Sequence, residues 1–138
     1  MYNGYKELTV WKDSIKLVVD IYEITKCFPA SEKFGLTSQM RRSAISMPSN
    51  IAEGWSRNYD KVFIQFLNTT QGSAAELETQ LLIAVELKFL KPEAIEEVMS
   101  LLIRIKKMIR SLTNKLKAKV NGQLHKDKEE GESHQFAH

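Results

Sequence analysis

The chain has 138 residues and a formal net charge of +3, with 43% hydrophobic and 27% charged residues. Such a chain is typical of one globular domain, large enough to bury a core without covalent crosslinks. Its single cysteine, Cys27, excludes an internal disulfide and a cysteine-based zinc site, and no apolar run approaches the roughly 20 residues of a membrane span. Because the N-terminus also lacks the basic-then-apolar order of a signal peptide, we expect a soluble, cytoplasmic protein.

The N-terminal third of the chain contains two segments in which apolar residues recur every three or four positions, the spacing of an amphipathic helix. The first helix ends before Phe28-Pro29, because the residue preceding a proline avoids helical geometry. A connection over residues 30–35 leads to a second helix that begins near Leu36 or Thr37 and ends around Gly54. The predicted buried row of the first helix is Leu8, Trp11, Ile15, Val18, Tyr22 and Thr25.

The second predicted helix contains a proline, Pro48, in its interior. Its buried seam keeps the same phase on both sides of that proline, which predicts one continuous helix rather than two. Since Pro48 has no N–H to offer the carbonyl of Ala44, we expect a kink there. The seam consists of Met40, Ala44, Met47 and Ile51.

Polar residues occupy the opposite side of this helix, and they form a candidate partner face. The same spacing is equally expected for an ordinary solvated surface, so this interpretation competes with a purely structural one. The candidate partner face consists of Arg41, Arg42, Ser46, Ser49, Asn50, Glu53 and Arg57.

A third and longest helix is predicted after a short junction at residues 55–58. Gly72 lies inside it and costs about 1 kcal/mol relative to alanine, so we expect a neighbouring helix to approach closely there. The predicted buried row is Phe63, Leu67, Thr70, Ala74, Leu77, Leu81 and Ala84.

A fourth helix restarts at Lys91-Pro92-Glu93, because proline suits the first helical position and acids suit the first turn. Leu101 and Met108 add a second apolar row, which indicates either a further interface or a wide core face. Asn121-Gly122 is a helix stop, so residues 1–122 are expected to be an all-α four-helix domain and residues 123–138 a disordered polar tail. The main row is Ile95, Val98, Leu102, Ile105, Ile109, Leu112 and Leu116.

The sequence offers little for catalysis. All three histidines, His125, His134 and His138, lie in the tail, so no rigid element holds an imidazole near a nucleophile or at a di-iron site. Glycine-rich phosphate loops and dinucleotide fingerprints are missing. We therefore expect no enzyme, no catalytic residue, no metal or cofactor, and no small-molecule substrate.

Positive charge is concentrated in the fourth helix: residues 91–120 contain eight basic and three acidic residues. Bases at this density attract a phosphate backbone without reading its sequence, and the absence of interleaved aromatics argues against base stacking. Bases near a helix C-terminus also favour the helix dipole, which is a sufficient structural explanation. The predicted nucleic-acid-binding residues are Arg104, Lys106, Lys107, Arg110, Lys115, Lys117 and Lys119.

Several sequence words, spread over about residues 5–118, resemble a known bacterial family of four-helix bundles. They are Leu8–Lys12, Phe34–Arg42, Ser46–Gly54, Phe63–Leu67 and Gly72–Glu78. The family was first found as proteins encoded in intervening sequences of 23S rRNA genes, and its members are often labelled ribosomal proteins. The resemblance implies an up-down bundle that assembles as a ring, with a homopentamer expected. It also implies a likeness in shape to the retroelement accessory proteins that associate with a reverse transcriptase and nucleic acid.

Two functions of different class follow. One is a basic oligomer that binds RNA or DNA through the fourth helix. The other is an oligomeric scaffold that binds a protein partner, such as a reverse transcriptase or a ribonucleoprotein, through the candidate partner face.

Overall fold

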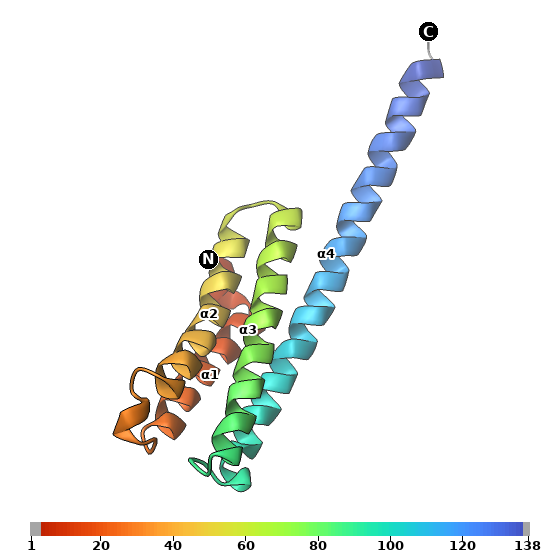
Figure 1. Cartoon of the computed structure of the whole chain (residues 1–138). Coiled ribbons are helices and arrows are strands. Elements are labelled where there is room, and N and C mark those ends of the chain that lie inside the picture. The colour runs from red at the N-terminus through yellow and green to blue at the C-terminus, as the bar shows by residue number, and fades with distance from the viewer. Residues whose placement is uncertain (1–3, 137–138) are drawn as a thin grey trace.

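The computed structural model describes the backbone of residues 4–136 and the side chains of residues 4–131. It contains the α-helices α1 (Thr9–Thr25), α2 (Leu36–Ser56), α3 (Asp60–Glu86) and α4 (Glu96–Phe136). Short 3₁₀ turns precede α1, α2 and α4, at Gly4–Glu7, Ala30–Glu32 and Pro92–Ile95. Consecutive helices run antiparallel and α1 also packs on α4, which closes the bundle, while α4 projects beyond it (Figure 1). The predicted all-α, up-down four-helix bundle is confirmed.

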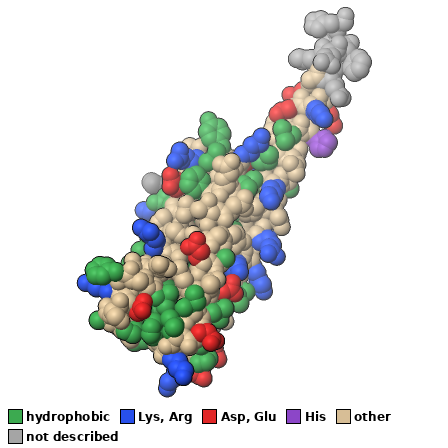
Figure 2. Space-filling view, viewed as in Figure 1, with side chains coloured by type: hydrophobic (Ala, Val, Ile, Leu, Met, Phe, Trp, Pro, Cys, Tyr) green, Lys and Arg blue, Asp and Glu red, His purple; other side chains and the backbone are tan. Residues whose placement is uncertain are grey.

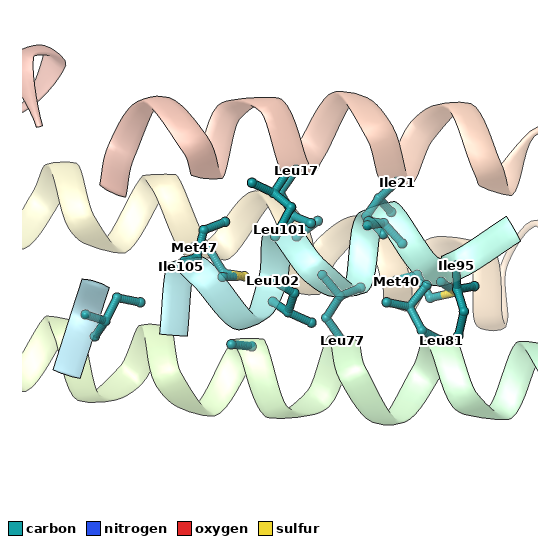
Figure 3. Packing of buried hydrophobic residues seen from close by; sticks show 14 of the residues in the cluster. Leu17, Ile21, Met40, Met47, Leu77, Leu81, Ile95, Leu101, Leu102 and Ile105 are labelled. Carbon is teal, nitrogen blue, oxygen red and sulfur yellow. The ribbon is translucent and has the colours of Figure 1, made fainter. Parts of the chain in front are cut away.

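The core lies along the bundle axis, where aliphatic side chains from all four helices meet (Figure 3). The rows predicted for the second and third helices are confirmed, because every residue of both is buried. Thr70 is tolerated among them because its hydroxyl donates to the carbonyl of Phe66, at 2.9 Å. A buried hydroxyl satisfied by its own helix adds no unpaired polar group to the core.

The register of α1 differs from the prediction. Its buried residues are Val10, Ser14, Leu17, Ile21 and Thr25. The predicted row lies to one side: Leu8, Trp11 and Val18 are partly buried and Ile15 and Tyr22 are exposed. The true row was hidden because Ser14 interrupts it, and Ser14 can be buried only because its Oγ donates to the carbonyl of Val10, at 2.7 Å. This shift leaves an apolar surface on the side of α1 that borders α2.

Helix α2 passes through Pro48 without a break, as the phase of its seam predicted. Pro48 is buried, and two nearby polar side chains bond to backbone carbonyls of the same helix. Ser46 Oγ donates to the carbonyl of Ser43 at 2.8 Å, and Asn50 Nδ2 donates to that of Ser46 at 2.7 Å. The kink at Pro48 remains a prediction.

Close helix packing occurs at a different glycine from the one predicted. A Cβ on Gly72 would have no heavy atom within 4 Å, so the predicted approach of a neighbouring helix there is wrong. Gly54, near the end of α2, is buried against α3, where a Cβ would lie 2.6 Å from the Cβ of Phe66. Only glycine therefore allows α2 and α3 to approach so closely at this end of the bundle.

The main row of α4 is buried from Ile95 to Ile109, while Leu112 and Leu116 are partly buried. Of the second row, Leu101 is buried and Met108 is partly buried against the core, so this row widens the core face of α4. The sequence predicted that this helix stops at Asn121-Gly122, but the helix continues to Phe136. The described side chains from 121 to 131 are all exposed, and the boundary of the folded domain at residue 122 remains a prediction.

Removal of residues 123–138 tests that boundary. Because the described side chains beyond Val120 are exposed, the truncation should change the free energy of unfolding by no more than about 0.5 kcal/mol and leave self-association unchanged. Thermal unfolding and light scattering of the full and truncated chains are the measurements. A clear loss of stability would show that the C-terminal segment packs on the bundle or on another copy.

Within the described part of the chain, no helix combines the length and apolar character needed to cross a membrane.

Candidate nucleic-acid interface

The basic residues of α4 lie on the surface because its core side is already occupied by aliphatic residues. Val98, Leu102, Ile105 and Ile109 face the bundle, and the seven predicted bases fall on the remaining sides of the helix. Figure 2 shows basic side chains along the right-hand edge of the molecule, over α4. The seven bases divide into two groups according to their partners.

Three of them form ion pairs with acids of other helices. Arg104 Nε lies 3.2 Å from Asp13 Oδ2 of α1. Lys106 Nζ lies 3.0 Å from Glu78 Oε2, and Lys119 Nζ lies 3.2 Å from Asp60 Oδ2, both of α3. Since these pairs reach the solvent, each contributes at most about 1 kcal/mol to stability. Their charges are nevertheless largely neutralised, which makes these bases poor candidates for phosphate binding.

The other four bases, Lys107, Arg110, Lys115 and Lys117, are exposed and have no ion pair within the described part of the chain. Lys107, Arg110 and Lys117 are three and seven residues apart and therefore lie on one side of the helix. We call these three residues the basic strip. It spans about 15 Å at 1.5 Å per residue. Lys115 lies on the other side of the buried row of α4, seven residues from Met108 and therefore on the same side of the helix as that residue.

A shallow groove between α3 and α4 lies at the start of the basic strip. Its lining includes Gln71 of α3 and Ile103, Lys107 and Arg110 of α4. Gln71 Nε2 donates to the backbone carbonyl of Lys106, at 3.0 Å, and so fixes the glutamine against α4. The groove is therefore bordered by the paired base Lys106 and by two bases, Lys107 and Arg110, that have no ion pair among the described residues.

The structure draws one residue of the candidate partner face, Arg41, toward α1, and the use of this face by a partner remains a prediction. Arg41 is held on the α1 side, where its guanidinium lies 4.4 Å from the ring centroid of Tyr22 and its Nε donates to Thr25 Oγ1, at 3.0 Å. Arg57 pairs with Glu53 at 2.8 Å. Ser46 and Asn50 bond to the α2 backbone. Arg42 and Ser49 are exposed and have no such bond among the described residues, so of the seven residues only Arg41 is drawn toward another helix.

The acids Asp13, Asp60 and Glu78, together with Gln71, were missed as parts of this site. Each belongs to a helix other than α4 and is at least 28 residues from its partner along the chain. No local pattern relates such residues, so only the packing of α4 against α1 and α3 identifies which bases are paired. Among the described residues, no group of three or more His, Cys, Asp or Glu is placed to hold a metal ion.

The fold and this surface define a class of protein: a closed up-down bundle whose long last helix carries an unpaired basic strip. A family model for the 23S rRNA-intervening sequence proteins matches residues 6–111, and the chain belongs to that family. The predicted resemblance is thereby confirmed.

A solved structure has the same fold. It is the crystal structure of a protein of unknown function from the S23 ribosomal protein family of Bacteroides thetaiotaomicron VPI-5482. That protein is 24% identical to this chain, and the superposition has a TM-score of 0.70 over 76% of this chain and 98% of the other. No curated protein matches the chain.

Proposed function

We propose that this protein is a non-enzymatic, cytoplasmic, oligomeric protein that binds the backbone of RNA or DNA through the basic strip and Lys115 of α4. The observation that carries the proposal is that these four bases are exposed and unpaired, in a segment without an acidic residue from 98 to 126. Unpaired bases gain most from a phosphate, because binding there breaks no existing ion pair and releases counterions from the nucleic acid.

Contacts to phosphates rather than to bases fit the composition of the strip. Between Lys107 and Lys117 there is no aromatic side chain on which a base could stack. Lysine and arginine on an exposed helix follow the phosphates and position the protein without selecting a sequence. The name of the family refers to the intervening sequence of a ribosomal RNA, which makes RNA the first ligand to test.

Self-association belongs to the proposal because one strip makes few contacts. Three or four phosphate contacts on a single chain give weak binding at physiological salt. In an oligomer the strip is repeated, and the second and later contacts become intramolecular, so that the assembly binds appreciably more tightly than one copy. A homopentameric ring is the assembly that we expect.

The test compares two triple variants that lose the same charge. One replaces the basic strip, with Lys107→Ala, Arg110→Ala and Lys117→Ala; the control replaces the paired bases, with Arg104→Ala, Lys106→Ala and Lys119→Ala. We expect the first to weaken binding to every RNA and duplex tested, and to flatten the plot of log affinity against log salt by about 2–3 units per chain. The control should retain most of the wild-type slope, because its bases are already neutralised by Asp13, Glu78 and Asp60.

Two results would overturn the proposal. If both triple variants weaken binding equally, net charge rather than the basic strip decides the affinity. If the wild-type protein binds neither RNA nor duplex DNA at low salt, the protein is better explained as a scaffold for a protein partner. Circular dichroism of all three proteins is the necessary control for folding.

A further inference from the structure

An apolar groove runs between α1 and α2 on the outside of the bundle. It exists because of the register of α1, which leaves Trp11 and Val18 only partly buried at the edge of the core and Ile15 exposed, on the side that borders α2. Two of its residues, Ile15 and Ile45, are 40% and 41% exposed, and Val19 continues the apolar surface along α1 as far as Tyr22, whose ring is covered by the guanidinium of Arg41. The lining contributed by the two helices is Trp11, Ile15 and Val18 with Ile45, Pro48 and Ala52. A contiguous exposed apolar surface of this kind usually marks an interaction site.

Unpaired bases flank this groove. Lys12 is three residues from Ile15 and therefore on the same side of α1, and Arg42 is seven residues from the groove residue Ser49 on α2. Both are exposed, and neither has an ion pair within the described part of the chain. The acid of this part of α2, Glu53, is already paired with Arg57. The groove therefore favours an apolar partner that carries acidic residues.

The C-terminal end of α3 has this complementary character. Leu82, Ile83 and Leu87 are 52%, 42% and 53% exposed, which is unusual for three large aliphatic residues within one turn and a half. Glu86 is exposed on the same stretch and has no ion pair among the described residues, while its base, Lys88, follows the helix end. Glu76, six residues before Leu82, is exposed and also has no ion pair there, although its Oε2 accepts a hydrogen bond from Ser43 Oγ of α2, at 3.4 Å. Figure 2 shows hydrophobic side chains gathered at the lower end of the bundle with acidic side chains around them.

We infer that the groove between α1 and α2 receives the C-terminal end of α3 from a second copy of this chain. Aliphatic side chains of the α3 end fill the apolar groove, and Glu76 and Glu86 of one copy approach Lys12 and Arg42 of the other. This inference deepens the self-association included in the proposed function and names the surfaces that mediate it.

Charge favours contact between the two unlike surfaces over contact between two like ones. A groove packed against a second groove would bring Lys12 and Arg42 of both copies together, and two α3 ends would bring four glutamates together. Like charges facing each other across an interface cost several kcal/mol, whereas the head-to-tail arrangement pairs opposite charges. A head-to-tail contact uses two different surfaces of each copy, so it repeats from copy to copy until a ring closes.

The experiment uses one variant for each surface. Ile45→Glu places an acid in the groove, and Ile83→Arg places a base in the α3 end; both positions are exposed, so the fold should survive. Leu124→Arg makes a comparable change at an exposed residue of the α4 extension, outside both surfaces, and serves as the control. Light scattering at micromolar concentrations measures the mass of each protein and of mixtures, and circular dichroism checks folding.

We expect wild type and the Leu124→Arg control to assemble, and Ile45→Glu and Ile83→Arg each to be monomeric. An equimolar mixture of the two monomeric variants should form dimers or larger mixed assemblies, because an intact groove meets an intact α3 end at one contact and the introduced glutamate faces the introduced arginine at the next. If either variant assembles as the wild type does, its surface is not the interface. A mixture that stays monomeric would mean that the contact is not head to tail, and a monomeric wild type would overturn the inference altogether. None of these variants replaces a base of the basic strip. RNA binding by the monomeric variants therefore tests the proposed function separately.

Discussion

The variant Leu102→Ala is expected to lower the free energy of unfolding by about 2–5 kcal/mol, the largest effect of any substitution considered for this protein. Leu102 is fully buried near the N-terminal end of α4, where it packs with residues of the other helices in the bundle core (Figure 3). Its truncation removes apolar contacts and leaves a cavity, because a closely packed core relaxes only partly around a missing side chain. Urea or thermal unfolding followed by circular dichroism measures the loss.

The neighbouring substitution Ile103→Ala is the matched control. Ile103 belongs to the same turn of α4 but is 42% exposed, so its truncation should change the free energy of unfolding by about 0.5 kcal/mol or less. Similar losses of unfolding free energy at both positions would show that α4 is rotated about its axis so that Ile103 is also buried.

The second large effect is expected at the close contact between α2 and α3. Gly54→Ala should lower the free energy of unfolding by about 1–3 kcal/mol, because the new methyl group would lie 2.6 Å from the Cβ of Phe66. That Cβ is fixed to the backbone of α3, so only a movement of the helices can relieve the overlap. Any gain in helix propensity, up to about 1 kcal/mol, offsets part of this loss.

Gly72→Ala provides a control of opposite sign. A Cβ on Gly72 meets nothing within 4 Å, so alanine should raise the free energy of unfolding by up to about 1 kcal/mol through helix propensity alone. Thermal unfolding of the two variants should therefore shift in opposite directions from the wild type. A stabilised Gly54→Ala protein would contradict the close approach of α2 and α3.

These two glycines illustrate where reasoning from the sequence was sufficient and where it was not. Gly72 lies inside the predicted third helix, where it costs helix propensity, so the sequence indicated a glycine at a close packing contact and assigned it to Gly72, while Gly54 was predicted only as the end of the second helix. The sequence could not indicate which glycine, because the contact depends on where Phe66 of the next helix lies across the bundle. The register of α1 was missed for a related reason. Two rows of similar apolar content run along that helix, and only the position of α2 and α4 decides which of them is buried.

The candidate site divides in the same way. The concentration of bases on α4 is a property of the amino-acid order, and it was predicted residue by residue. The separation into three paired and four unpaired bases depends on Asp13, Asp60 and Glu78, which approach α4 from other helices. The separation of Arg41 from the rest of the candidate partner face likewise depends on Tyr22 and Thr25 of α1, which hold its guanidinium.

What the sequence determined by itself is the set of local preferences: four helical segments, the continuity of α2 through Pro48, the buried rows of α2, α3 and α4, and the basic character of the last helix. These follow from the 3.6-residue period and from the chemistry of single residues, neither of which requires knowledge of a neighbour. The tertiary structure alone decided the rotation of α1, the glycine at the helix contact, which bases keep a free charge, and where an apolar groove remains open. Each of these depends on groups that are distant in the chain, and such groups become neighbours only when the helices pack together.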